Sequence, residues 1–210
     1  MQYILMSWTI LKLFGIPIRL HFTMVLVPFL TYNLMPISGL IDVVIWASLV
    51  TLLFGSVLLH ELGHSLTAAH FGIRTQDIVL TPIGGIARVT EMPKNPKQEI
   101  IIAVAGPLVS LTLAAVSAGL AFSLPAISIL PKVIFEAVTI LFGINLVLAL
   151  FNLVPALPMD GGRVLRGVLA LKRDHLTATR IAAKIGRLLA GAGLLYAVLF
   201  GHFNLGLISI

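Results

Sequence analysis

Long apolar runs separated by short charged segments constrain this 210-residue chain more than any other feature. A helix needs about 20 predominantly apolar residues to cross the hydrocarbon core of a bilayer. Runs that approach or exceed this length lie at residues 20–37, 43–70, 99–124, 133–154 and 187–203, and a further run begins at residue 204 and stops at residue 210. The pattern predicts an all-α polytopic membrane protein with a bundle of about six transmembrane helices.

The composition agrees with a membrane protein. Hydrophobic residues make up 59% of the chain and charged residues 10%, whereas soluble domains are roughly 45–50% apolar and about 25% charged. We interpret residues 1–210 as a single transmembrane core domain, truncated within its sixth helix if the run after residue 204 is a span. The chain has no cysteine, so thiolate metal sites are excluded.

The positions of the basic residues predict how the chain is oriented in the cell membrane. The net charge is +6, and Lys and Arg cluster beside the apolar runs, which favours a lipid bilayer over nucleic acid as the partner. When the runs alternate across the membrane, every basic residue except Lys132 falls on one side. Because Lys and Arg concentrate in cytoplasmic loops, we expect a cytoplasmic N-terminus. The C-terminal half of the run at 43–70 then lies towards the cytoplasm.

Residues 73–89 do not form a simple span. The segment is rich in β-branched residues and is interrupted by Pro82 and Gly84-Gly85, a pattern typical of strand, turn and strand. Open sheet edges do not face lipid, so we expect this β-element at the interface or covered by helices.

The motif His60-Glu61-Leu62-Gly63-His64 matches the H-E-x-x-H pattern of zinc proteases. On a helix, residues four apart share one face, so both imidazoles can reach one Zn²⁺ while Glu61 lies beside it to accept a proton. Ionisable groups are costly within a bilayer and mark function there. The setting therefore favours a metal site over a chance match.

A catalytic zinc site takes three protein ligands and leaves a fourth position for water. His70 follows His64 at the spacing of a known third ligand, but the glycine that would turn the chain is replaced by Thr67. On a continuing helix His70 would lie about 9 Å further along the axis. We therefore expect His70 to be an interfacial residue at the helix end.

Asp160 is the better candidate for the third ligand. It ends a segment broken by prolines and a Gly-Gly pair, and such backbone is tolerated at membrane depth only within protein or beside a wet cavity. A carboxylate there requires a cation, although an aspartate can also cap the helix that follows. We place Arg163 at the aqueous edge rather than in a pair with Asp160.

Taken together, these motifs resemble the site-2 protease family of intramembrane metalloproteases, in particular members with a six-helix core. The resemblance rests on HELGH at 60–64, PIGG at 82–85, AGP at 105–107 and NLVPALPMDGGR at 152–163. It implies one Zn²⁺ per chain held by His60, His64 and Asp160, with Glu61 as general base. It also implies that the β-element at 73–89 offers a strand edge to an unwound substrate.

Asn152 resembles an asparagine that the family carries near its active site. Its amide could donate to the developing oxyanion or hold substrate. Equally, it could make a structural hydrogen bond at the broken end of the helix.

The function implied is hydrolysis of peptide bonds within or near transmembrane segments of membrane-protein substrates, known as regulated intramembrane proteolysis. One alternative is a membrane metal transporter or sensor that uses the same His/His/Asp site, which would leave Glu61 without a role. A second is a protease of prenylated tails, which takes a helix glutamate as third ligand, but Glu91, Glu99 and Glu136 lie in no such motif. The sequence leaves open the identity of the substrate and the oligomeric state.

Overall fold

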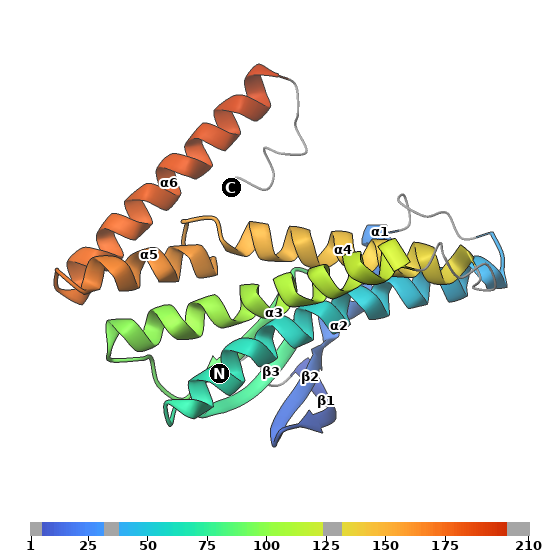
Figure 1. Cartoon of the computed structure of the whole chain (residues 1–210), viewed down its shortest axis with the longest axis horizontal. Helices are drawn as coiled ribbons and strands as arrows, with labels where there is room; N and C mark the ends of the chain where they lie inside the picture. The colour runs from blue at the N-terminus through green and yellow to red at the C-terminus, as the bar shows by residue number, and fades with distance from the viewer. Residues whose placement is uncertain (1–5, 32–37, 124–131, 201–210) are drawn as a thin grey trace.

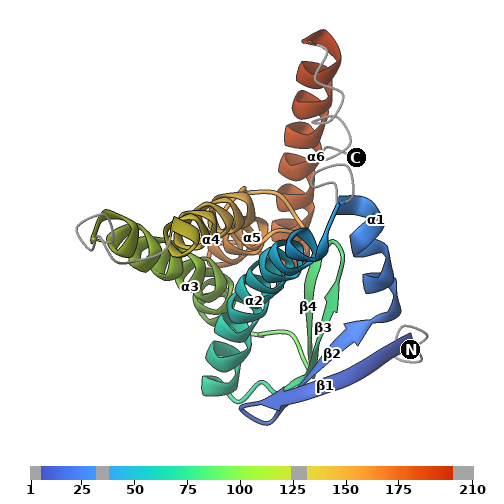
Figure 2. The same cartoon turned by 90° about the vertical axis from the view of Figure 1, so that its right-hand side faces the viewer.

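A computed structural model describes residues 6–31, 38–123 and 132–200 (Figures 1 and 2). The elements follow one another as β1 (Ser7–Leu13), β2 (Ile16–His21), the 3₁₀ helix η2 (Phe22–Leu26), α1 (Val27–Thr31), α2 (Leu40–His70), β3 (Thr75–Thr81), β4 (Gly84–Val89), α3 (Pro96–Ser123), α4 (Lys132–Asn152), α5 (Asp160–Ala170) and α6 (His175–Leu199).

Three of these helices are long and apolar enough to cross a membrane. They are α2, α3 and the Ile134–Asn152 part of α4, with mean hydropathies of 2.1, 2.2 and 2.3. Large apolar side chains such as Leu108, Val116 and Val147 remain more than half exposed on them. Such surfaces are stable when they face lipid, so the chain is a multi-pass membrane protein.

The expected set of spans needs correction in two places. The described part of the run at 20–37 forms the end of β2, then η2 and the five-residue α1, rather than one long helix. The 11-residue α5 lies outside the predicted spans and is too short to cross the bilayer. The run at 187–203 belongs to α6, which is not among the clearly apolar helices. Residues 32–37, 201–203 and the run at 204–210 lie outside the described residues.

A four-stranded sheet accompanies the helices, with strand order β1-β2-β3-β4. β1 pairs antiparallel with β2, β2 parallel with β3, and β3 antiparallel with β4. The β3–β4 hairpin confirms the predicted strand–turn–strand segment. Strands β1 and β2 were not predicted, although Ile16 and Ile18 are buried and alternate with the less buried Pro17 and Arg19 in the way a half-buried strand requires.

The sheet packs with one face against α2. Ile18 and Ile78 of the sheet are fully buried and form a core cluster with Val57 and Leu62 of α2. Figure 2 shows α2 between the sheet and the layer formed by α3 and α4. The helix that carries HELGH is therefore enclosed by protein on two sides.

Helix α3 connects α2 to the C-terminal half of the chain, since it packs against α2, α4 and α5. In its first turn Glu99 is buried, and its Oε1 accepts hydrogen bonds from Nε (2.7 Å) and Nη2 of Arg166 on α5. This buried ion pair fixes α5 to α3. Figures 1 and 2 show α6 extending away from the other helices.

Candidate metal centre

The two histidines of HELGH lie on the buried face of α2, where His60 is 2% and His64 is 6% exposed. Because they are four residues apart on an unbroken helix, their rings stand one turn apart on the same side. The two Nε2 atoms point towards each other at a distance of 3.2 Å. This confirms the helical geometry expected of H-E-x-x-H.

Asp160 completes the group from the other half of the chain. Its Oδ2 lies 3.1 Å from Nε2 of His60 and 3.0 Å from Nε2 of His64. Asp160 is the first residue of α5 and is 7% exposed, whereas the N-cap position belongs to Met159. The carboxylate therefore faces the imidazoles instead of capping its helix. Gly161 and Gly162 let the start of α5 pack against the chain at Leu153–Leu157, where a Cβ would clash with backbone.

Three donor atoms at these distances match what a tetrahedral zinc site needs. Bonds of about 2.0–2.1 Å in a tetrahedron place ligand atoms about 3.3 Å apart, close to the 3.0–3.2 Å separations of the two Nε2 atoms and Oδ2. Within the described ranges, His60, His64 and Asp160 are the one set of three side chains that could hold a metal ion together.

Helix α3 forms the wall behind the imidazoles. The Nδ1–H of His64 donates to the carbonyl oxygen of Ile102 at 2.7 Å, and Nδ1 of His60 lies 3.0 Å from Oγ of Ser110. Between these two residues, a Cβ built on Gly106 would lie 2.7 Å from Nε2 of His60 and 2.6 Å from Cε1 of His64. Only glycine leaves room for both rings at this position.

Glu61 lies between two cavities. One of about 290 Å³ is lined by His60, Glu61 and Asn152 together with the β3–β4 turn. The other, of about 230 Å³, is lined by Glu61, His64 and Arg163 together with the end of β4. Strand β4 passes so close that a Cβ on Gly85 would lie 2.6 Å from Cγ of Glu61. Glu61 therefore lines two cavities, one shared with His60 and the other with His64.

Asn152, the last residue of α4, contributes to the larger of these cavities. Its Nδ2 donates to the carbonyl oxygen of Leu148 at 2.9 Å, one turn back in the same helix. This is the structural bond that one interpretation expected. The side chain still shares a cavity with His60 and Glu61, so its participation in chemistry stays a prediction.

Arg163 pairs with Asp160, whereas the sequence interpretation placed it at the aqueous edge and outside such a pair. Nη1 of Arg163 is 3.7 Å from Oδ1 of Asp160, which precedes it by three residues in α5. The side chain of Arg163 is 26% exposed. The two carboxylate oxygens of Asp160 are thus used differently, Oδ2 towards the imidazoles and Oδ1 towards the guanidinium. The short helical spacing of three residues, combined with a buried carboxylate, makes this pairing favourable.

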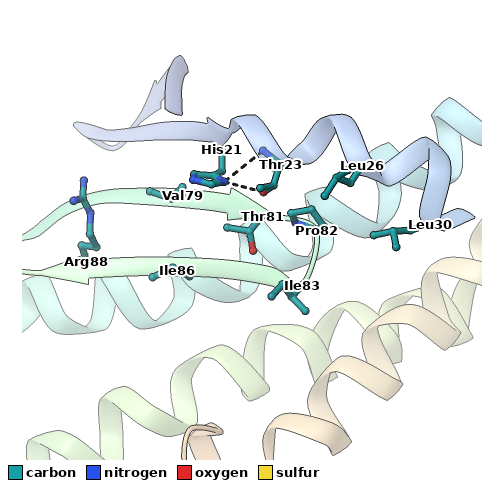
Figure 3. A pocket seen from close by; sticks show the side chains of 10 residues that line it. All are labelled: His21, Thr23, Leu26, Leu30, Val79, Thr81, Pro82, Ile83, Ile86 and Arg88. Atoms are coloured by element: carbon teal, nitrogen blue, oxygen red, sulfur yellow. Dashed lines mark hydrogen bonds between the residues drawn. The ribbon is translucent and has the colours of Figure 1, made fainter. Parts of the chain in front are cut away.

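Other titratable residues that the sequence singled out stay outside this group. His70 is exposed at the C-terminal end of α2, as expected, and does not join the metal-directed side chains. Glu99 is engaged by Arg166. His21 lines a separate groove of about 560 Å³ on the face of the sheet opposite α2, where its Nδ1 lies 2.8 Å from Oγ1 of Thr23 (Figure 3). Among the described residues that line this groove, His21 is the one with a side chain that commonly binds metals.

A family model described as peptidase family M50 matches residues 48–141 and 128–193, a region that contains all three metal-directed residues. The chain belongs to peptidase family M50. The M50 match agrees with the resemblance to site-2 proteases that the motifs indicated.

Relatives of this M50 chain include a zinc metalloprotease of Methanocaldococcus jannaschii, 41% identical over 207 residues that make up 97% of this chain and 58% of that protein. A relative from Synechocystis sp. is 40% identical over 161 residues, 76% of this chain and 40% of its own length. The chain thus spans between two fifths and three fifths of the length of these curated relatives. The solved structure of the site-2 protease from M. jannaschii matches with a TM-score of 0.69 and 39% identity, covering 97% of this chain and 90% of that chain.

These relatives weigh against the alternative of a metal transporter, since the M50 homologues are zinc metalloproteases. Three residues of α3 beside the imidazoles were not predicted from the sequence: Ile102, Gly106 and Ser110. The AGP motif at 105–107 was a signal for one of them, but neither a backbone carbonyl nor a lone serine in an apolar helix carries a recognisable pattern.

Proposed function

We propose that this chain is the membrane-embedded core of an intramembrane zinc protease that hydrolyses peptide bonds within or near transmembrane segments of other membrane proteins. The observation that carries the proposal is the meeting of three buried ligand atoms, those of His60 and His64 on the apolar helix α2 and that of Asp160 on α5, next to Glu61. Three ionisable side chains in such a helix are costly unless they serve a site. Membership of M50 supports the same chemistry.

In this proposal His60, His64 and Asp160 hold one Zn²⁺ per chain. Bound zinc supplies Lewis-acid polarisation of the scissile carbonyl and lowers the pKa of the attacking water. Glu61 takes the proton from that water and later delivers it to the leaving amine. Arg163 holds Oδ1 of Asp160, which leaves Oδ2 directed at the metal position.

The substrate would lie in the cavity shared by Glu61 and Asn152. That cavity is bordered by the β3–β4 turn, and β4 is one of the two outer strands of the sheet as described. An unwound stretch of a substrate helix could add to this strand by backbone hydrogen bonds, which would hold its peptide bonds open to attack. Asn152 uses its Nδ2 towards Leu148, and the remaining hydrogen of that amide would face the substrate.

The orientation in the membrane completes the proposal. Eleven of the 14 Lys and Arg residues lie at the connection from α2 to α3 or after α4, on one side of the three apolar spans, which supports an active site towards the cytoplasm. The pairing of β2 with β3, which follows α2, supports a cytoplasmic N-terminus on the same side. Cysteine accessibility measured in intact cells tests this, because the chain has no cysteine of its own. Single cysteines at Lys94 and Lys172 should be protected from an impermeant reagent added outside.

The catalytic role of Glu61 is tested by Glu61→Gln in detergent-solubilised or reconstituted protein. The variant should retain zinc, because Glu61 is not a ligand, and should cleave a single-span model substrate about 10²–10⁴-fold more slowly. Zinc content is measured by mass spectrometry and cleavage by gel assay. Wild-type cleavage rates in the variant would contradict the proposal.

A further inference from the structure

Helix α3 supplies no metal ligand, yet it contacts both ligand histidines through one face. Ile102, Gly106 and Ser110 are spaced four residues apart on α3 and therefore lie in one stripe along it. Ile102 accepts the Nδ1–H of His64, Gly106 leaves space for both rings, and Ser110 lies against Nδ1 of His60. The stripe is a cradle for the two imidazoles.

The cradle holds the two rings by different means. A backbone carbonyl only accepts hydrogen bonds, so the 2.7 Å contact with Ile102 places the proton of His64 on Nδ1 and leaves Nε2 free for a metal. In the part of the chain that the structure describes, Nδ1 of His60 has one partner for the same task, the hydroxyl of Ser110 at 3.0 Å. The ring of His64 is therefore oriented by a main-chain carbonyl, whereas the ring of His60 is oriented by a side-chain hydroxyl.

We propose that Ser110 is a positioning residue for the metal site: its Oγ accepts the Nδ1–H of His60 and keeps Nε2 of that ring directed at Oδ2 of Asp160. This inference rests on the proposed zinc site. Partners that bond the outer nitrogen of a ligand histidine fix its tautomer and ring orientation, and their loss typically costs about 10–100-fold in metal affinity.

Burial makes the hydroxyl more than a packing group. Ser110 is 0% exposed in an apolar helix, where a polar side chain without a partner is costly. Helix α3 offers a matched control at Ser117, two turns further on, which is 2% exposed and is not among the described hydrogen-bond partners of His60, His64 or Asp160. Replacing either serine by alanine removes one buried hydroxyl from the same helix.

The experiment compares purified wild type, Ser110→Ala and Ser117→Ala after removal of metal. Zinc affinity is measured by competition with a chromophoric chelator, and the visible spectrum of the Co²⁺-loaded protein reports ligand geometry. We expect Ser110→Ala to bind zinc about 10–100-fold more weakly and to shift the Co²⁺ bands. Ser117→Ala should match wild type in both. Because alanine favours helices, we expect both variants to fold. The unfolding temperature of the metal-free proteins checks this.

A double-mutant cycle with His60→Ala separates positioning from general packing. When His60 is absent, Ser110→Ala should cause no further loss of the residual zinc affinity, because the hydroxyl acts through that ring. Equal losses in both backgrounds, or wild-type affinity in Ser110→Ala, would overturn the inference while leaving the zinc site in place. A wild-type chain that binds no zinc would instead overturn the proposed function itself.

Discussion

Nε2 of His64 lies 3.0 Å from Oδ2 of Asp160, although 96 positions separate the two residues in the chain. The histidine belongs to α2 and the aspartate to the first turn of α5, and α3 packs against both helices. The site is therefore a property of the packed helices rather than of the HELGH motif alone. Changes that move α5 or crowd α3 should impair metal binding without touching a ligand.

The first such change is Gly106→Ala. The added Cβ would lie within 2.7 Å of Nε2 of His60, so at least one imidazole must move away from the metal position. We expect loss of zinc exceeding the roughly 10–100-fold caused by losing a hydrogen-bond partner of a ligand, measured by chelator competition. Gly119→Ala on the same helix is the control, because nothing lies within 4 Å of a Cβ there. Zinc affinity equal in the two variants would show that the close approach of α3 is unimportant.

A second prediction concerns the buried ion pair between α3 and α5. Arg166→Met leaves the carboxylate of Glu99, whose side chain is 2% exposed, without its partner. Breaking a buried pair in this way costs roughly 3–5 kcal/mol, so the unfolding temperature in detergent should fall. Zinc affinity should fall too, because α5 carries Asp160.

The matched control for this ion pair is the double variant Glu99→Met/Arg166→Met. It removes both charges and should be more stable than Arg166→Met alone, since no uncompensated charge stays buried. If the double variant were the less stable of the two, the stabilising role assigned to the pair would be incorrect.

A third prediction separates the two roles considered for Asn152. If Asn152 donates to the oxyanion, Asn152→Ala should lower kcat by about 10²–10³-fold and leave the zinc content unchanged. If the side chain of Asn152 serves only to bond the carbonyl oxygen of Leu148, the same substitution should lower the unfolding temperature and leave kcat unchanged. Because Asn152 lines the cavity of Glu61, we expect the first result. Kinetics and thermal unfolding on the same preparation decide between them.

The candidate metal centre was largely predictable because each part carries a local signal. H-E-x-x-H fixes two ligands on one helix face, and Asp160 stands out as a carboxylate in broken backbone at membrane depth. The pairing of Arg163 with Asp160 was missed, since its placement depended on where α5 begins. The cradle on α3 was missed because a backbone carbonyl, such as that of Ile102, has no sequence signature.

The fold was predictable in its apolar helices and less so near the N-terminus. The runs that became α2, α3 and α4 are long and uninterrupted, whereas the run at 20–37 is preceded by the alternating pattern of Ile16 to Leu20. That alternation indicates a strand, but it is lost when hydropathy is averaged over a window as long as a membrane span. Strand β2 precedes α2 in the sequence and β3 follows it, so no local sequence pattern reveals their parallel pairing.

The central claim is that Asp160, together with His60 and His64, holds one zinc ion. Asp160→Asn keeps the size of the side chain but removes the charge that a zinc ligand contributes. Zinc per chain, measured by mass spectrometry on protein purified in the presence of zinc, should be one for wild type and close to zero for Asp160→Asn, with Asp174→Asn as an exposed control on α6 that keeps its zinc. Full zinc occupancy and unchanged zinc affinity in Asp160→Asn would contradict the account.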